Sequence, residues 1–167
     1  NEKVNPAMVS NYVQYVIDSF LISMAKRYDV KGKTYFKYPN KYYYTDIGLR
    51  NARLNYRQYD PGHIMENMIY NELLRRGYSV DVGVVCDRAG NSKVQKEIDF
   101  VAQRGSEKIY IQVSDNISEE NTFEREVSPL LQIRDAYPKM IIARTKHPKY
   151  SHEGIEIYDI ADWLLQE

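Results

Sequence analysis

Residues 97–114 read EIDFVAQRGSEKIYIQVS, and this stretch decides the fold. Apolar and polar residues alternate over Glu97–Gln103 and again over Ile109–Ser114, which is the pattern of half-buried strands. Gly105-Ser106 between them suits a two-residue type II′ turn, since glycine stands at its first central position. The stretch therefore predicts a β-hairpin whose first strand presents one apolar face made of Ile98, Phe100 and Ala102.

The register set by this turn has a consequence for the polar residues of the hairpin. It places Asp99 opposite Gln112, and it places Glu97 opposite Ser114. The polar faces of the two strands thus converge on one spot, which strand pairing alone does not require. We expect this spot to lie near an acidic residue of the preceding helix, Glu66.

The elements around the hairpin extend it to the order α-β-β-β-α-β after residue 60, with a small β-α appendix. Capping residues, periodicity and turn residues predict each boundary. We expect a helix Gly62–Arg76 opened by Asp60-Pro61 and closed by Gly77, a strand Ser79–Val85, a polar loop Asp87–Lys96, a helix 124–135, strands Met140–Ala143 and Ile155–Tyr158, and a last helical turn Ile160–Leu165. The fold class is α/β (α+β).

The first 58 residues predict a helix followed by a hairpin. Asn5-Pro6 is a typical helix start, and an apolar stripe follows it, made of Val9, Tyr12, Val13, Val16, Ile17 and Phe20. Strand-like runs then surround Lys31-Gly32-Lys33, namely Leu21–Tyr28, Thr34–Tyr38 and Lys41–Thr45, and Asp46 caps a short helix, Ile47–Leu54. A helix followed by a basic hairpin predicts a winged-helix-like segment over residues 1–58, and residues 59–167 form the second part.

Charge is divided unevenly along the chain, although the net charge is zero. Between Lys26 and Arg57, nine Lys and Arg residues face two acids, a local balance of +7. Such a segment attracts a polyanion or an acidic protein partner, and a merely solvated hairpin is the alternative. The residues expected to contact nucleic acid are Lys26, Arg27, Lys31, Lys33 and Lys37.

Composition excludes several classes of protein. The 167 residues are 43% hydrophobic and 28% charged, so disorder is excluded, and no apolar stretch is long enough to cross a bilayer. The single cysteine, Cys86, makes no internal disulfide, which fits the cytoplasm. Because the sequence starts at Asn1, we expect a piece of a longer protein. It carries no GK[ST] phosphate loop, Gly-x-Ser-x-Gly elbow or zinc-spaced histidines.

One acid on the predicted helix 62–76 stands out. Glu66 falls on the arc between Tyr70 and Leu73, where a carboxylate is costly unless it is paired or bound to a cation. A metal site and an ion pair with a Lys or Arg from elsewhere both remain open. Glu72 points about 120° away from Glu66 and does not serve the same site.

Five short motifs along the chain resemble those of a known family, and they occur in the expected order over nearly the whole chain. They are Lys26–Asp29, Lys41–Arg50, Gly62–Asn67, Glu97–Phe100 and Tyr110–Ser114. The sequence is similar to the uncharacterised domain that follows the AAA+ ATPase module in many bacterial and archaeal ATP-binding proteins. The second part also resembles the PD-(D/E)XK restriction-endonuclease-like fold with its αβββαβ core, and the first part of the family is similar to a winged helix.

The resemblance implies roles for individual residues. Glu66 matches the helix acid and Asp99 the second-strand acid, while Gln112 stands where Asp or Glu is usual and Ser114 where Lys is usual. A metal, if any, is Mg²⁺ or Mn²⁺ held weakly by Glu66, Glu97, Asp99 and Gln112. Gln112 brings no charge to such a site, and Ser114 cannot stabilise a developing phosphorane.

The sequence therefore leaves three functions open. The leading one is the C-terminal region of an AAA+ family ATPase, with a degenerate nuclease site and a role in recognising nucleic acid or a partner. The first alternative is an active metal-dependent DNA nuclease. The second is a structural or oligomerisation module of the ATPase, in which the basic hairpin docks on another copy or on the ATPase.

Overall fold

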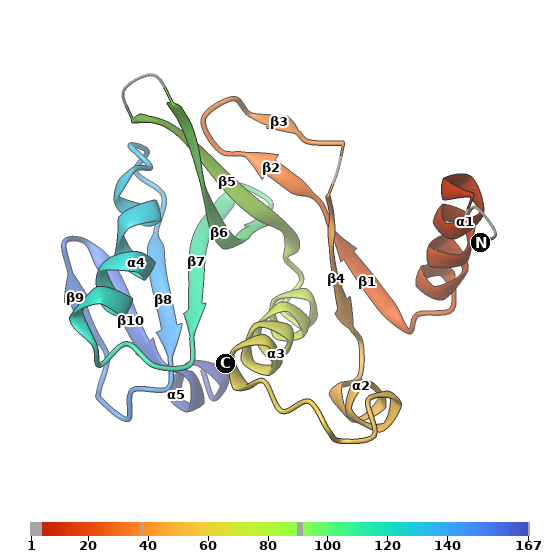
Figure 1. Ribbon diagram of the computed structural model, residues 1–167. Coiled ribbons are helices and arrows are strands. Elements are labelled where there is room, and N and C mark those ends of the chain that lie inside the picture. Colours follow the sequence, from red (N-terminus) through yellow and green to blue (C-terminus); the bar gives the residue numbers. More distant parts are fainter. Residues whose placement is uncertain (1–4, 38, 90–91, 167) are drawn as a thin grey trace.

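The computed structural model describes residues 5–37, 39–89 and 92–166 and shows a mixed α/β protein (Figure 1). Asn5, Asp46, Asp60 and Asp159 each cap a helix N-terminus through a side-chain oxygen. The helices are α1 (Pro6–Asp18), α2 (Ile47–Arg53), α3 (Pro61–Arg75), α4 (Glu120–Leu131) and α5 (Ile160–Leu164). The strands are β1 (Ile22–Ala25), β2 (Arg27–Asp29), β3 (Thr34–Tyr35), β4 (Lys41–Tyr44), β5 (Ser79–Ala89), β6 (Ser92–Arg104), β7 (Glu107–Ser114), β8 (Lys139–Ala143), β9 (Tyr150–His152) and β10 (Ile155–Asp159).

An eight-stranded mixed sheet forms the centre, in the order β3-β2-β5-β6-β7-β8-β10-β9. β5 and β6 are antiparallel, as are β6 and β7, whereas β7 and β8 are parallel. One apolar cluster joins α3 and α5 to one face of the sheet, and a second joins α4 to the other face. Helices thus cover both faces (Figure 1).

The turn that decides the hairpin is where the sequence predicted it. Gly105 has a φ of +59°, and Arg104 pairs with Glu107 across the turn. The ladder then continues to the pair Phe100↔Ile111. At the end of α3, Gly77 has a φ of +82°, which confirms its expected role in closing that helix.

The predicted apolar face of β6 is correct for Phe100 and Ala102, which share one cluster, but wrong for Ile98, because the strand contains a β-bulge. Between the pairs Asp81↔Val101 and Gly83↔Ile98 the register shifts by one residue. Ile98 therefore packs in the α4 cluster, while Phe100 packs in the α3 cluster. A Cβ on Gly83, next to the bulge, would lie 2.9 Å from Val101 and 3.0 Å from Ile98, so a larger residue there would force its neighbours to shift.

The first part of the chain does not confirm a winged helix. β1 pairs with β4 in a separate two-stranded ribbon, whereas β2 pairs in parallel with β5 and carries β3 at the edge of the main sheet. The strand run predicted over Leu21–Tyr28 is divided at Lys26, and its two halves join different sheets. The two parts expected to meet at residue 58 therefore share one sheet.

Two further boundaries and one strand differ from the predictions. β5 and β6 continue as a ladder through most of the polar loop expected over Asp87–Lys96, as far as the pair Ala89↔Ser92; its Gly90-Asn91 lies outside the described residues. The helix expected over 124–135 is α4, which starts earlier, with Glu120 in its first turn, and ends two residues after Pro129, a residue without a backbone N–H. The edge strand β9 was not predicted.

Helix α1 lies at the edge of the molecule beside β1 (Figure 1), and none of its residues is buried. Val13 and Ile17 are half-buried, but Val9, Tyr12, Val16 and the adjoining Phe20 are exposed. Only part of the predicted apolar stripe therefore packs. No helix in the described part of the chain is long and apolar enough to cross a membrane.

Candidate functional site

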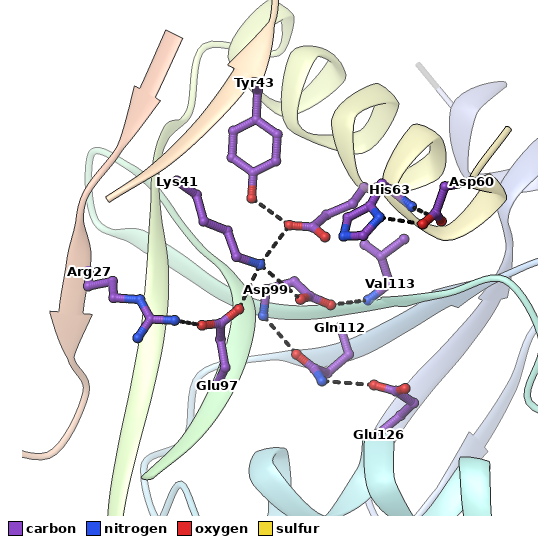
Figure 2. Close-up of polar contacts among 11 residues, drawn as sticks. Arg27, Lys41, Tyr43, Asp60, His63, Glu97, Asp99, Gln112, Val113 and Glu126 are labelled. Carbon is purple, nitrogen blue, oxygen red and sulfur yellow. Dashed lines mark hydrogen bonds and ion pairs between the residues drawn. The ribbon is translucent and has the colours of Figure 1, made fainter. Parts of the chain in front are cut away.

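A lysine from the first part of the chain lies among three acids of the second part. Lys41 Nζ is 2.9 Å from Glu66 Oε1, 2.6 Å from Glu97 Oε1 and 3.9 Å from Asp99 Oδ1. Glu97 also forms an ion pair with Arg27 of β2. Figure 2 shows Lys41 reaching from its strand toward Glu97 and Asp99. The structure thus brings together the three predicted acids, and two cations neutralise part of their charge.

Helix α3 holds β4 in place and so positions Lys41. The Asn67 amide is almost fully buried and pairs with the backbone of Tyr44, accepting from its N–H at 2.9 Å and donating to its carbonyl at 2.7 Å. Tyr43 stacks on Tyr70 with ring centroids 4.1 Å apart and donates to Glu66 Oε1 at 2.6 Å. Because side chains alternate along β4, Lys41 and Tyr43 reach the same carboxylate.

The bulge and the end of the β6–β7 ladder position Asp99. Beyond the pair Phe100↔Ile111, side chains replace backbone carbonyls as acceptors: the Asp99 N–H donates to Gln112 Oε1 at 2.7 Å, and the Val113 N–H donates to Asp99 Oδ2 at 2.8 Å. Asp99 therefore lies beside Gln112, as the hairpin register predicted.

Gln112 also links this site to α4. Its Nε2 donates to Glu126 Oε2 at 2.9 Å, and both side chains are buried (Figure 2). Arg125 holds the other oxygen of Glu126 at 2.9 Å. The amide of Gln112 is thus bonded at both ends, since its oxygen accepts from Asp99 and its nitrogen donates to Glu126.

Ser114 and Glu97 do not form the predicted pair, because the β6–β7 ladder ends before either residue. Glu97 instead pairs with Val84 of β5. The Ser114 side chain is buried, and its hydroxyl donates to the Asn116 carbonyl at 3.1 Å. It brings no positive charge to the site.

Burial and crowding of charge change the acid–base properties of the site. Burial, reinforced by the charge of Glu66, raises the pKa of Asp99 to about 7, while Lys41 and the Val113 N–H act in the opposite direction. Burial, followed by the Glu66 charge, raises the pKa of Tyr43 far above its ordinary value. Tyr43 therefore stays protonated and donates to Glu66.

The acids do not fit a divalent metal while Lys41 is among them. Oxygens of Glu66, Glu97 and Asp99 that could bind a hard cation face the ammonium group instead. Among the residues that the structure describes, no three His, Cys, Asp or Glu side chains are arranged to hold a metal ion. An open cleft of about 990 Å³ adjoins the site, and Asp99, Gln112 and Glu126 lie along its wall.

The predicted nucleic-acid contacts fall into two groups. Lys26, Lys31, Lys33 and Lys37 have exposed side chains in and around β2 and β3. Arg27 is partly buried in its ion pair with Glu97 and belongs to the carboxylate site instead. The basic hairpin, defined as residues 26–37, therefore presents four lysines to solvent.

Sequence reasoning missed three residues of the site: Lys41, Asn67 and Glu126. Lys41 lay within the motif Lys41–Arg50, and its alternation with Tyr43 was a usable signal. Asn67 follows Glu66 directly, on the face of α3 that was expected to be enclosed. Glu126 lies one helical turn before the buried Leu130, so its burial on α4 could also be deduced.

Comparison with known proteins places the chain in a family. A model of a domain of unknown function, DUF4143, matches residues 61–163, and the chain belongs to this family. An uncharacterized protein of Haemophilus influenzae is 39% identical over 158 residues, which cover 95% of this chain and 37% of the relative. An uncharacterized protein of Methanocaldococcus jannaschii is 31% identical over 163 residues, which cover 97% of this chain and 34% of that relative. No solved structure matches significantly.

Proposed function

We propose that the chain is a non-catalytic domain with a PD-(D/E)XK-like fold that recognises nucleic acid as part of a longer ATP-binding protein. The order α3-β5-β6-β7-α4-β8 supports the fold assignment, with two antiparallel pairs followed by a parallel one and helices on both faces. This order of elements supports the αβββαβ core expected from the sequence.

One observation carries the proposed loss of catalysis: the Lys41 ammonium group lies within 4 Å of Glu66, Glu97 and Asp99. Metal-dependent hydrolysis of a phosphodiester needs a divalent cation at such acids and a positive group beside the attacked phosphate. Here the acids already hold a cation from the protein itself, and Ser114 provides a hydroxyl in place of a lysine. The site therefore serves as a structural link between β4, α3 and β6.

The basic hairpin supports nucleic-acid recognition. Its four exposed lysines lie at one end of the main sheet, where β2 and β3 leave the side chains open to solvent. Lysine contacts to phosphates are independent of base sequence and release counterions. We therefore infer weak binding to duplex DNA that does not depend on sequence.

The link to an ATPase rests on the family resemblance. The chain spans just over a third of the length of each relative it matches. In the proposed function, the remaining part contains an ATPase module, and this domain directs that module to nucleic acid.

The experiment compares DNA affinity of the unaltered chain with that of Lys31→Glu/Lys33→Glu, using fluorescence anisotropy. The matched control is Lys146→Glu/Lys149→Glu, which makes the same charge change at exposed positions outside the hairpin. We expect the DNA affinity of the unaltered chain to fall at least about tenfold over about a fourfold rise in salt concentration. At constant salt, we expect the hairpin variant to lose affinity by a similar factor and the control variant to keep it. Equal losses in both variants, or binding that ignores salt, would contradict nucleic-acid recognition by the hairpin.

A further inference from the structure

Helix α1 carries an exposed apolar stripe that the fold leaves uncovered. Met8, Val9, Tyr12, Tyr15 and Val16 lie within an arc of about 120° on the helix, since successive residues differ by about 100°. All five are exposed, and Phe20 extends the stripe past the end of the helix. We call these six residues the α1 patch.

The other side of α1 explains why the helix is nevertheless held in place. Val13 and Ile17 are half-buried and point to a different arc from the α1 patch. The helix therefore packs against the rest of the protein through a narrow apolar surface, and it presents a broader apolar surface, the α1 patch, to solvent. An amphipathic surface helix normally shows the reverse arrangement, with the broad apolar stripe covered.

The α1 patch is large for a surface that stays in water. Tyr12, Tyr15 and Phe20 are 62%, 64% and 82% exposed. With roughly 150–250 Å² for each aromatic side chain and smaller areas for the three aliphatic ones, the patch exposes about 600 Å². This is at the upper limit of the largest apolar patches on monomers, about 300–600 Å².

We infer that the α1 patch is the contact between two copies of this chain. Two patches facing each other would bury about 1,200 Å² in total, which is the lower end of the range for specific interfaces. Between Asn5 and Ser19 the only charged residue is Asp18. Two such helices can therefore lie side by side with little repulsion between like charges, and a two-fold axis makes one patch complementary to itself.

The inferred dimer is independent of the proposed role in nucleic-acid binding. The α1 patch lies on α1, whereas the basic hairpin lies at β2 and β3 of the main sheet. Weak and transient complexes lie at the low end of the size range, so we expect a dimer that dissociates in the micromolar range and depends on concentration.

Sedimentation velocity between about 1 and 200 µM tests this inference, because that span brackets micromolar dissociation. We expect the unaltered chain to change from monomer to dimer, and Tyr12→Glu/Tyr15→Glu to raise the dissociation constant at least about tenfold through burial of charge in the interface. The matched control is Tyr56→Glu/Tyr59→Glu, at tyrosines that are 75% and 78% exposed outside the patch, and it should dimerise normally.

Two results would overturn the inference. A chain that stays monomeric throughout the series would show that another segment or partner covers the α1 patch, or that nothing does. A dimer that persists unchanged in Tyr12→Glu/Tyr15→Glu would place the interface elsewhere. Far-ultraviolet circular dichroism of each variant checks that the exposed substitutions leave the fold intact.

Discussion

The Lys41 ammonium group lies 2.9 Å from Glu66 Oε1 and thereby joins β4 to α3 across 25 residues of sequence. The Glu66 carboxylate is largely shielded from water, with its side chain 14% exposed. An acid in such a position requires a cation, and the first part of the chain supplies it. The pair therefore fixes the N-terminal ribbon to the domain as well as neutralising the acid.

Replacing Lys41 with methionine should destabilise the protein. The change leaves Glu66, Glu97 and Asp99 close together without the shared ammonium group, at a cost of about 2 kcal/mol, less than for a fully buried pair because Lys41 keeps some contact with water. Urea unfolding followed by circular dichroism measures the free energy of unfolding. Lys149→Met is the matched control, since it breaks an exposed pair with Glu156 at 2.8 Å and should have little effect.

Divalent cations give the same variant a second readout. Mg²⁺ or Mn²⁺ should raise the melting temperature of Lys41→Met, because the three acids are then available, but should leave that of the unaltered chain unchanged. An equal shift in both proteins would mean that a metal binds beside Lys41. A loss of stability in Lys149→Met as large as in Lys41→Met would show that Lys41 contributes no more to stability than a lysine in an exposed ion pair.

Asp99 should make the protein less stable as pH rises. Its pKa is raised to about 7 in the folded state, against an ordinary value of 3.8, so the folded protein holds a proton there that the unfolded chain has released. Stability from this group is therefore present at low pH and is lost between about pH 4 and pH 7, by about 1.4 kcal/mol for each pKa unit at most. Asp99→Asn should remove this slope. Compared with the unaltered chain at the same pH, the variant should be more stable at pH 8 than it is at pH 4.

Glu72 provides a control with the opposite sign. Hydrogen bonds from Arg75 and then Arg76 lower its pKa to about 2 although burial opposes them. Its contribution is present above its ordinary value of 4.5 and is lost as pH falls toward 2. Glu72→Gln should therefore change only the acid side of the stability profile. If Asp99→Asn also changed only the acid side of the profile, the pKa of Asp99 would not be raised in the folded protein.

Much of the fold follows from local signals in the sequence. The caps at Asn5, Asp46 and Asp60 and the turn at Gly105 are set by residues within a few positions of one another, so periodicity and capping rules find them. The bulge in β6 depends on Gly83 in the neighbouring strand, which no local pattern of β6 reveals. The pairing of β2 with β5 likewise depends on contacts between distant segments.

The candidate site was also predicted only in part, because some of its contacts are local in sequence and others are not. Asp99 and Gln112 share a hairpin, so their register follows from the turn between them. Glu66 stood out as an acid on an enclosed arc, and an ion pair was one of its two open interpretations. The identity of the partner, Lys41, depends on how the N-terminal ribbon packs on α3, and this is tertiary information.

The contact between Gln112 and Glu126 predicts a strong coupling between these residues. Gln112→Glu removes the amide donor and places a second carboxylate against a buried one, which should cost about 2 kcal/mol or more. Adding Glu126→Gln restores a donor and an acceptor in exchanged positions, so the double variant should recover at least half of the loss. A double-mutant cycle by urea unfolding measures this coupling, and additive losses would show that the two residues act separately.

The unaltered chain should not cut DNA with Mg²⁺ or Mn²⁺. The oxygens that would hold the metal face Lys41, and the position expected to carry a lysine is Ser114, whose hydroxyl is bonded to the Asn116 carbonyl. Linear and supercoiled DNA, incubated with the chain and each metal, give the readout, with Asp99→Ala as the matched inactive variant. Equal background in both proteins is the expected result. Cleavage by the unaltered chain that disappears in Asp99→Ala would identify an active nuclease, in which Lys41 moves away from the acids to admit the metal or itself provides the positive charge that Ser114 lacks.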